Sequence, residues 1–420
     1  MDFEPTQELL SLARGLPEGL CDHCLGRRFA RIGQATNKER GNAIRNALLA
    51  AGERREPAAI CPICENIFND VESMAAAAIA KIGDRDYRTF LFGSRQEKTS
   101  FELETRFGYS EHLKNELNRE LGKKLEALTG KTVDFENPDI TIIADCGFGS
   151  LEIQVAPLYV FGRYRKFERG IPQTRWPCRQ CRGRGCPRCG GTGKMYPTSV
   201  EELVAGPLMA AALGREHSLH GMGREDIDAR MLGNGRPFVV EIQDPRKRGI
   251  DLVALESEIN RLSAGRVEVE GLRPSSLREV RELKESRAVK TYVAKVAFER
   301  PVPEEKLKLL EKTFTGLQVQ QWTPNRVSHR RAELERKRRV LEFRAEGPDS
   351  FRITAEAGLY IKELIHGDGG RTRPSVQEQL GVRCSVVSLD VVSTGGTGDG
   401  QGIEGLPGED KEHSEGGSQE

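Results

Sequence analysis

The sequence has no run of about 18 apolar residues, the length that a membrane-spanning helix needs. Its N-terminus does not combine a basic start with a long apolar segment, as a secretory signal does. A Gly-x-Gly-x-x-Gly or Walker sequence in a suitable strand-loop-helix context is also lacking. These absences exclude a membrane partner and argue against enzymes that bind a nucleotide. We therefore expect a soluble cytoplasmic protein.

The composition is that of a globular protein with one unusual end. The 420 residues suffice for roughly two or three domains, with 30% charged and 37% hydrophobic residues. The net charge of +1 is uneven, because the segment from Thr394 onward holds seven Asp or Glu and one Lys. Residues 1–393 therefore carry +7. We expect the Gly/Ser-rich acidic tail, residues 394–420, to be disordered.

Eight of the ten cysteines lie in Cys-x-x-Cys pairs, a pattern that favours metal in a reducing compartment over disulfides. The pairs make two sets of possible ligands: Cys21, Cys24, Cys61 and Cys64, then Cys178, Cys181, Cys186 and Cys189. Four thiolates leave no open position for substrate, so we predict one or two structural zinc ions. His23 is expected to be a bystander, and Cys146 and Cys384 to be buried, inert thiols.

Two basic segments predict a nucleic-acid partner. Between Arg163 and Lys194 there are ten Arg or Lys and one acid, Glu168, with aromatic residues interleaved for stacking on bases. A second cluster, residues 326–339, has seven Arg or Lys, but its composition also suits an ordinary exposed helix. The predicted RNA-binding residues are Arg163, Arg165, Lys166, Arg169, Arg330 and Arg331.

The region before the first basic segment predicts a small α+β domain. Leucines repeat every four residues over 111–129, as in a helix, and residues 132–144 and 151–155 alternate as strands do. This order, followed by Gly-Arg-Tyr-Arg-Lys at 162–166, resembles a THUMP domain, an RNA-binding module of tRNA-modifying enzymes.

Residues 220–238 combine four glycines with charged residues, which predicts a functional loop; the alternative is a charged surface turn. A capping box at Ser199 and Glu202 predicts the start of a helix before it. Gly206-Pro207 is expected to break or kink that helix. Residues 237–242 are predicted to form a strand.

Three motifs together resemble those of pseudouridine synthases. They are an aspartate in Gly223-Arg-Glu-Asp226, a strand with Lys290-Thr-Tyr292, and a helix with Gly358-Leu-Tyr360-Ile-Lys362. With the cysteine pairs, the THUMP-like region, Thr323-Pro-Asn-Arg-Val-Ser-His-Arg-Arg331 and His366-Gly-Asp-Gly-Gly-Arg-Thr372, residues 15–393 are similar to the archaeal-type tRNA pseudouridine synthases of the THUMP-containing pseudouridine synthase ten family.

The resemblance implies an α+β, multidomain fold. It comprises a zinc-binding module at 1–75, a THUMP-like domain at 76–175, and a catalytic domain at 176–393 with a zinc-knuckle insert at 176–195. The catalytic domain is expected on a mostly antiparallel sheet. The implied activity is isomerisation of uridine to pseudouridine in the T loop of tRNA, with no organic cofactor and no obligate protein partner.

By this resemblance Asp226 is the catalytic carboxylate, acting as a nucleophile or as the base that removes a sugar proton. Lys362 pairs with Asp226, Tyr292 stacks on the uracil, and Arg224 helps to hold the substrate loop open. Tyr360 and Leu380 are further substrate-binding residues. The alternatives are core packing for Tyr292 and a solvated lysine for Lys362. We expect Asp228 to point elsewhere and stabilise the loop.

Two other functions fit parts of the sequence. One is a non-catalytic, zinc-containing RNA-binding adaptor, which would use the cysteine sets and the basic segments alone. The other is a different THUMP-containing tRNA-modifying enzyme, such as a methyltransferase or a sulfur-inserting enzyme. Both of those enzyme classes need the nucleotide-binding motif that the sequence lacks.

Overall fold

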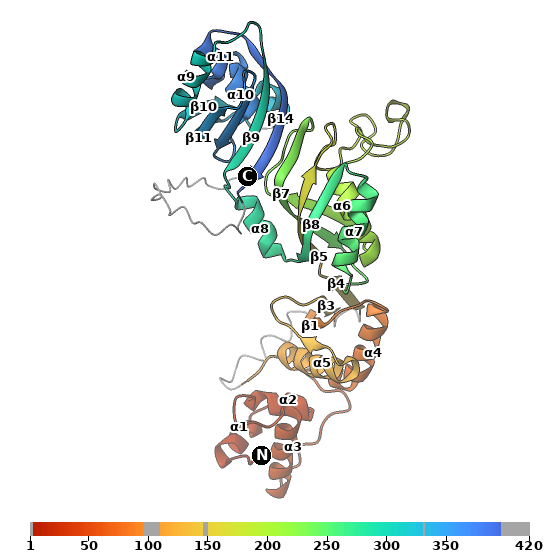
Figure 1. The fold of residues 1–420 in the computed structure, drawn as a ribbon. Helices are drawn as coiled ribbons and strands as arrows, with labels where there is room; N and C mark the ends of the chain where they lie inside the picture. The colour runs from red at the N-terminus through yellow and green to blue at the C-terminus, as the bar shows by residue number, and fades with distance from the viewer. Residues whose placement is uncertain (1–2, 96–109, 146–149, 331, 396–420) are drawn as a thin grey trace. The chain divides into compact units, whose positions relative to one another are not determined.

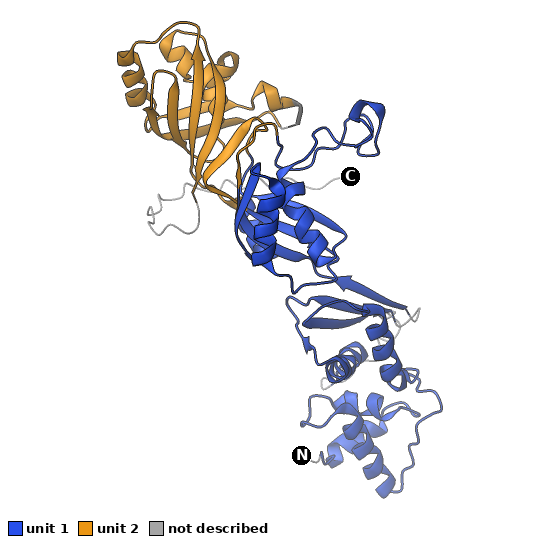
Figure 2. Cartoon of the chain, turned by 45° about the vertical axis from the view of Figure 1, so that its right-hand side comes forward, with its two compact units in different colours: residues 1–164, 171–224, 238–284 blue, residues 165–170, 225–237, 285–420 orange. Residues whose placement is uncertain are grey.

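A computed structural model describes residues 3–95, 110–145, 150–330 and 332–395, without the side chains of residues 329 and 330. Cys146, Arg331 and residues 396–420 of the expected tail lie outside this part. No helix in the described ranges is long and apolar enough to cross a membrane. Contacts group the chain into two units (Figure 2): unit 1 holds residues 1–164, 171–224 and 238–284, and unit 2 holds 165–170, 225–237 and 285–420.

Unit 1 begins with short helices: α1 (Gln7–Arg14), α2 (Asp22–Gly26), the 3-10 helix η1 (Arg27–Phe29) and α3 (Asn37–Ala50). Helices α2 and α3 pack so closely that only glycine fits at their contact. A Cβ on Gly26 would lie 1.8 Å from the carbonyl oxygen of Asn37, and one on Gly41 would lie 1.9 Å from that of Asp22. This contact holds the first cysteine pair against α3.

A four-stranded sheet follows in unit 1, with the order β2-β1-β3-β4. Its elements are η2 (Ile67–Asp70), α4 (Val71–Ile82), β1 (Thr89–Arg95), α5 (Leu113–Thr129), β2 (Thr132–Val133), β3 (Ile140–Asp145) and β4 (Ser150–Val155). Strand β1 is parallel to β2 and β3, and β3 is antiparallel to β4. Leu117, Leu121 and Leu125 of α5 are buried in the core beside these strands. The predicted helix and the strand predicted at 151–155 are confirmed (Figure 1), whereas the single strand predicted over 132–144 is two separate strands, β2 and β3, which both pair with β1.

The remaining elements lie wholly or partly in unit 1, because the chain passes into unit 2 at residues 165–170 and 225–237. They are β5 (Leu158–Lys166), η4 (Pro187–Cys189), α6 (Val200–Ala212), β6 (Glu216–Gly221), β7 (Ala229–Gln243), α7 (Leu252–Ser263), β8 (Val267–Pro274) and α8 (Leu277–Glu285). Ser199 caps α6 by accepting a hydrogen bond from the Glu202 backbone N–H, as predicted. The predicted break at Gly206-Pro207 is wrong, because α6 continues through Pro207.

Unit 2 is built on a mostly antiparallel sheet with the order β13-β10-β11-β12-β9-β14, followed by the first part of β7. Its elements are β9 (Lys290–Phe298), α9 (Glu304–Phe314), β10 (Gln318–Trp322), η5 (Asn325–Arg330), β11 (Glu335–Ala345), β12 (Ser350–Ala355), α10 (Ile361–His366), η6 (Gly367–Gly370), β13 (Thr372–Arg373), α11 (Val376–Leu380) and β14 (Cys384–Thr394). Helices α9, α10 and α11 share one apolar core with the sheet (Figure 1). Strands β14 and β7 are parallel, whereas β9, β10, β11 and β12 pair antiparallel.

Two local predictions are corrected here. The second basic cluster is not a helix, because η5 is followed by strand β11. The loop expected over residues 220–238 is shorter, because β6 ends at Gly221 and β7 begins at Ala229. Gly233 lies within β7 with a φ of +58°, and a Cβ there would meet the carbonyl oxygen of Val392 at 1.8 Å. This glycine therefore serves the close approach of two strands rather than a loop.

Candidate active site

The backbone around Asp226 accepts hydrogen bonds from the last residue of β5 and from a residue shortly after it. The Lys166 ammonium group donates to the carbonyl oxygens of Asp226 and Ile227, at 3.4 and 3.2 Å. The backbone N–H of Gly170 donates to the Ile227 carbonyl at 2.9 Å. The Asp226 carbonyl in turn accepts a hydrogen bond from the Ala229 N–H at 3.0 Å, which closes a turn at the start of β7.

Beside this turn lies a buried group of charges. Glu225 forms an ion pair with Arg236 at 2.9 Å and lies 3.9 Å from Lys166. The three side chains are 0–1% exposed. Burial lowers the pKa of Lys166, although the charge of Glu225 opposes that shift. The residue before Asp226 is thus fixed in the interior, which sets the direction of the carboxylate after it.

The Asp226 carboxylate is partly open to solvent, with 26% of its side chain exposed, and faces two cations. Its Oδ1 accepts a hydrogen bond from Nη1 of Arg326 at 2.8 Å. Its Oδ2 lies 3.4 Å from Nζ of Lys362. The predicted proximity of Lys362 and Asp226 is present in the structure, and Arg326 adds a cation that the sequence reasoning did not assign.

Asp228 was expected to point away from Asp226 and its partners. That expectation is wrong. Both carboxylate oxygens of Asp228 lie 2.7 Å from Nζ of Lys362, so this ammonium is shared between two aspartates. Burial alone would raise the pKa of Asp228, but the hydrogen bond and charge of Lys362 lower it overall. The Asp228 side chain is 69% exposed, so it is the more solvated of the two acids.

The Arg326 guanidinium contacts Asp226 through one nitrogen and other groups through the rest of its atoms. Its Nε donates to Glu363 at 2.7 Å, and the Glu363 side chain is only 2% exposed. The guanidinium also lies 5.9 Å from the ring centroid of Tyr360. The sequence signal that could have found this residue is Thr-Pro-Asn-Arg at 323–326, which was noted only as part of a motif and a basic cluster.

Tyr292 lies on β9 and packs against the core of unit 2 while it remains partly exposed. Burial raises the pKa of its hydroxyl to about 12; the charge of Arg236 lowers it and that of Asp226 raises it, so the phenol stays neutral at ordinary pH. Leu380, at the end of α11, is 5% exposed and belongs to the same core. The roles predicted for the two residues, a stacking ring and an apolar wall, stay predictions.

The predicted RNA-binding residues differ in what the structure allows. Lys166 is fully buried, so its assignment to RNA is wrong: its ammonium group supports the Asp226 turn instead. Arg169 donates to the Asp228 and Leu389 carbonyls and to the carboxylate of Asp390, which indicates a structural role as well.

The other RNA-binding candidates are less defined. Arg163 and Arg165 lie on β5 and are half-buried. Arg331 and the side chain of Arg330 lie outside the described part of the chain, so their assignment stays a prediction.

Arg224 belongs to unit 1, and its guanidinium lies 5.3 Å from the ring centroid of Trp176. Trp176 stands at the base of the cysteine-rich insert, where its carbonyl accepts from the Met195 N–H at 2.9 Å. The insert therefore supports Arg224, a link that the sequence motifs did not indicate.

Both cysteine sets have the geometry of a tetrahedral metal site. Within each set the four Sγ atoms lie within 4.8 Å of one another. The Sγ–Sγ separations include 3.5 Å for Cys21 and Cys64 and 3.9 Å for Cys178 and Cys186. Zinc with four thiolates at about 2.3 Å implies a separation of about 3.8 Å. These distances fit zinc and are far too long for disulfides.

The residues around the thiolates also fit a metal. In the second set the N–H groups of Gly185 and Gly193 donate to Cys181 and Cys189 Sγ at 3.2 Å. Both glycines have a positive φ, and a Cβ on Gly193 would lie 2.3 Å from the Gly183 carbonyl oxygen. Such N–H donors stabilise thiolates. In the first set, the four Sγ atoms form the group without His23, and the Nδ1 of His23 contacts Glu116 at 2.8 Å.

The lone cysteine that the structure describes is buried, as predicted. Cys384 has its Sγ 3.3 Å from the Ile365 carbonyl oxygen. Burial raises the pKa of this thiol to about 11, so it is protonated and unreactive at neutral pH.

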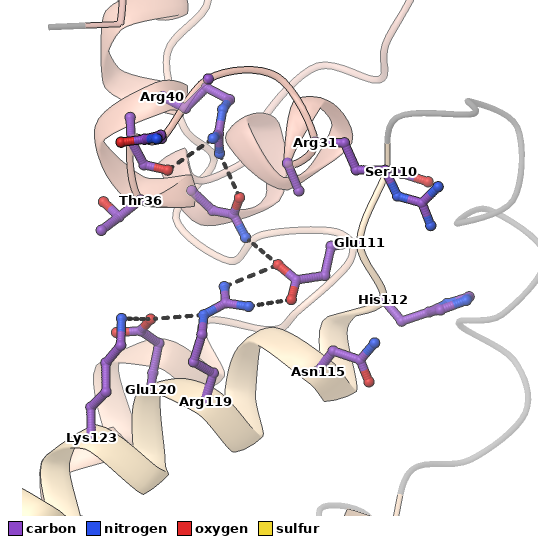
Figure 3. A pocket seen from close by; sticks show the side chains of 15 residues that line it. Arg31, Thr36, Arg40, Ser110, Glu111, His112, Asn115, Arg119, Glu120 and Lys123 are labelled. Carbon is purple, nitrogen blue, oxygen red and sulfur yellow. Dashed lines mark hydrogen bonds and ion pairs between the residues drawn. The ribbon is translucent and has the colours of Figure 1, made fainter. Parts of the chain in front are cut away.

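A separate pocket in unit 1 lies between the first helices and the N-terminal part of α5 (Figure 3). Its lining is rich in charge, but most of the labelled cations face an acid or a carbonyl. Arg119 forms a two-pronged pair with Glu111, and Lys123 lies 3.6 Å from Glu120. This pocket lacks an arrangement of groups like that around Asp226.

Comparison with known proteins gives concordant matches over most of the chain. A family model described as Pus10, C-terminal matches residues 159–394, and one described as Pus10 THUMP domain, archaeal, matches residues 74–145. A protein of Methanothrix thermoacetophila named tRNA pseudouridine synthase Pus10 is 44% identical over 416 residues, covering 90% of this chain and 92% of that protein. The protein of the same name in Methanothermobacter marburgensis is 46% identical over 389 residues, covering 90% and 95%.

A solved structure titled Crystal Structure of a Cbf5-Nop10-Gar1 Complex is 23% identical and covers 46% of this chain and 45% of that one. Its TM-score is 0.29, a likeness too weak to bear on the fold.

Proposed function

Because this chain belongs to the Pus10 family, whose relatives above are named tRNA pseudouridine synthases, we propose that it isomerises uridine to pseudouridine in the T loop of tRNA. Asp226 is the single catalytic carboxylate in this proposal. The observation that supports it is the position of Asp226: a partly exposed acid that two cations contact, on a turn whose backbone is anchored by buried groups.

The isomerisation requires few catalytic side chains. The C1′–N1 glycosidic bond breaks, the uracil turns, a C1′–C5 bond forms, C5 loses its proton, and N1 takes up a proton to become N1–H. Neither oxidation nor an external group is needed. A carboxylate can attack as nucleophile or remove a sugar proton as base, and both routes require a free carboxylate oxygen at the sugar or base. Tyr292 stacks on the uracil and keeps the detached ring in the site.

No organic cofactor enters this scheme, because the isomerisation is redox-neutral and internal to the nucleotide. Zinc at the two cysteine sets would be structural, since all four ligands in each set come from the chain. In this proposal residues 1–75 form the zinc module, 76–175 the THUMP-like domain and 176–393 the catalytic domain. The basic segment from Arg163 binds the tRNA backbone, with Lys166 removed from that set.

The test is a comparison of two aspartate variants on transcribed tRNA without added cofactor. Asp226→Asn keeps the shape of the side chain but removes its charge, so we expect tRNA binding to persist and turnover to be lost. Asp228→Asn is the matched control and should retain measurable turnover. Wild-type rates in Asp226→Asn would rule out this carboxylate.

Mapping pseudouridine in the treated tRNA tests the T-loop assignment. Product confined to another arm would contradict the substrate site while leaving the enzyme class intact. Tight binding of tRNA by the wild-type protein with no pseudouridine at all would instead support the adaptor function.

A further inference from the structure

We propose that Arg326 is a positioning residue that orients Asp226 and that Glu363 fixes Arg326 in place; this inference rests on the proposed catalytic role of Asp226. The three side chains form a chain of hydrogen bonds from the interior of unit 2 to the reacting carboxylate. They come from three elements: the turn before β7, the 3-10 helix η5, and helix α10.

The geometry uses both edges of one guanidinium group. Nη1 of Arg326 donates to Oδ1 of Asp226 at 2.8 Å, while Nε donates to Oε1 of Glu363 at 2.7 Å and Nη2 lies 3.5 Å from Oε2. A planar guanidinium can hold two carboxylates at a fixed angle, whereas an ammonium group imposes no such angle. The pairing therefore transmits the orientation of Glu363 to Asp226.

Glu363 is suited to be the fixed end of this chain. Its side chain is 2% exposed, and an unpaired buried carboxylate would be costly, so the contact with Arg326 must be maintained. The η5 turn that carries Arg326 is itself tied down. The N–H of Asn325 donates to Asp368 at 3.0 Å, and Nη2 of Arg371 donates to the Thr323 carbonyl at 2.7 Å.

Lys362 performs a different task in this arrangement. Its ammonium lies 2.7 Å from both oxygens of Asp228 but 3.4 Å from Oδ2 of Asp226. The short, direct hydrogen bond to Asp226 is thus the one from Arg326. Because Arg326 engages Oδ1, the geometry leaves Oδ2 as the oxygen that meets the uridine, with Lys362 beside it to balance its charge.

The experiment measures single-turnover rates at saturating tRNA together with the dissociation constant for tRNA. Arg326→Lys keeps the charge but cannot bridge the two acids, and Arg326→Ala removes both. A displacement of about 1 Å in a catalytic group can cost about 100-fold in rate, so we expect losses of about that size in the rate, with tRNA affinity unchanged. Glu363→Gln, which keeps the shape but weakens the pairing, should give a smaller loss in the rate alone.

Chemical rescue separates positioning from general structural damage. Added guanidinium ion should restore part of the turnover of Arg326→Ala in a concentration-dependent way, and methylammonium should restore less. The matched control is Arg344→Lys, an exposed arginine on β11 whose side chain is 69% exposed and pairs with Glu342. It should keep the wild-type rate. Thermal melting of each variant checks folding, and if Arg326→Ala fails to fold, the Arg326→Lys rate decides.

Two results would overturn the inference. One is a wild-type single-turnover rate in Arg326→Lys, or in a folded Arg326→Ala. The other is a variant that loses tRNA affinity and keeps its rate at saturation, since that would make Arg326 a phosphate contact. Neither result affects the proposed function: its enzyme class fails if the wild-type protein forms no pseudouridine, and its catalytic assignment fails if Asp226→Asn is active.

Discussion

Replacing Glu225 with glutamine tests whether the buried charges beside the Asp226 turn stabilise unit 2. The change keeps the shape of the side chain but removes the negative charge that Arg236 and Lys166 face in the interior. Removing one member of a buried ion pair costs about 3–5 kcal/mol. This cost applies here because all three side chains are almost fully buried, so water cannot compensate for the lost charge.

The two tryptophans of the chain make the measurement specific. Trp176 lies in unit 1 and Trp322 in unit 2, so a Trp176→Phe background leaves fluorescence that reports on unit 2 alone. With a urea dependence of about 2 kcal/mol per molar, a loss of about 4 kcal/mol lowers the unfolding midpoint of unit 2 by about 2 M.

The control for this prediction is Glu304→Gln in the same background. Glu304 is also in unit 2, but it is 78% exposed and pairs with Lys308 on the surface of α9. Its loss should leave the midpoint almost unchanged. If Glu225→Gln and Glu304→Gln unfold at the same urea concentration, the buried pair does not contribute as argued.

Two further predictions concern protons and metal. Burial lowers the pKa of Lys290 from 10.5 to about 8. The charge of Arg236 also lowers it, and the charge of Glu225 opposes the shift. Between these values the unfolded chain holds the proton and the folded protein does not, so this lysine makes stability rise with pH. The free energy of unfolding of the wild-type protein relative to Lys290→Met should therefore increase from pH 8 to pH 10; a constant difference would contradict this assignment. Elemental analysis of the purified protein should find two zinc ions per chain, one for each cysteine set, and Cys178→Ser should lower the content to one. A zinc content of zero in the wild-type protein would refute both sites.

Local signals in the sequence predicted local structure well. The Ser199 capping box begins α6, and the cysteine spacing predicted two groups that the fold brings together. Each of these depends on residues within a few positions of one another, or on side chains whose chemistry leaves few alternatives. The motif containing Asp226 and that containing Lys362 also belong to this class, because each motif is short.

The interactions between distant segments could not be predicted in the same way. Arg326 and Asp226 are 100 residues apart, and nothing in either segment specifies the other. Lys166 was predicted to be one cation of a basic surface. Its burial beside Glu225, a residue far along the chain, could not be seen from its neighbours in the sequence. Gly233 was predicted to be part of a loop. A glycine is needed there because the carbonyl of Val392, on another strand, approaches it closely, and the sequence does not show that contact.

The division of the chain into units has a practical consequence for dissecting this protein. Unit 2 is discontinuous, since residues 165–170 and 225–237 come from within the sequence of unit 1. A fragment that starts at residue 285 would retain Arg326, Lys362 and Glu363 but would lack Asp226. A truncation at this point therefore divides Asp226 from the cations that contact it, and point variants in the intact chain are the appropriate tool.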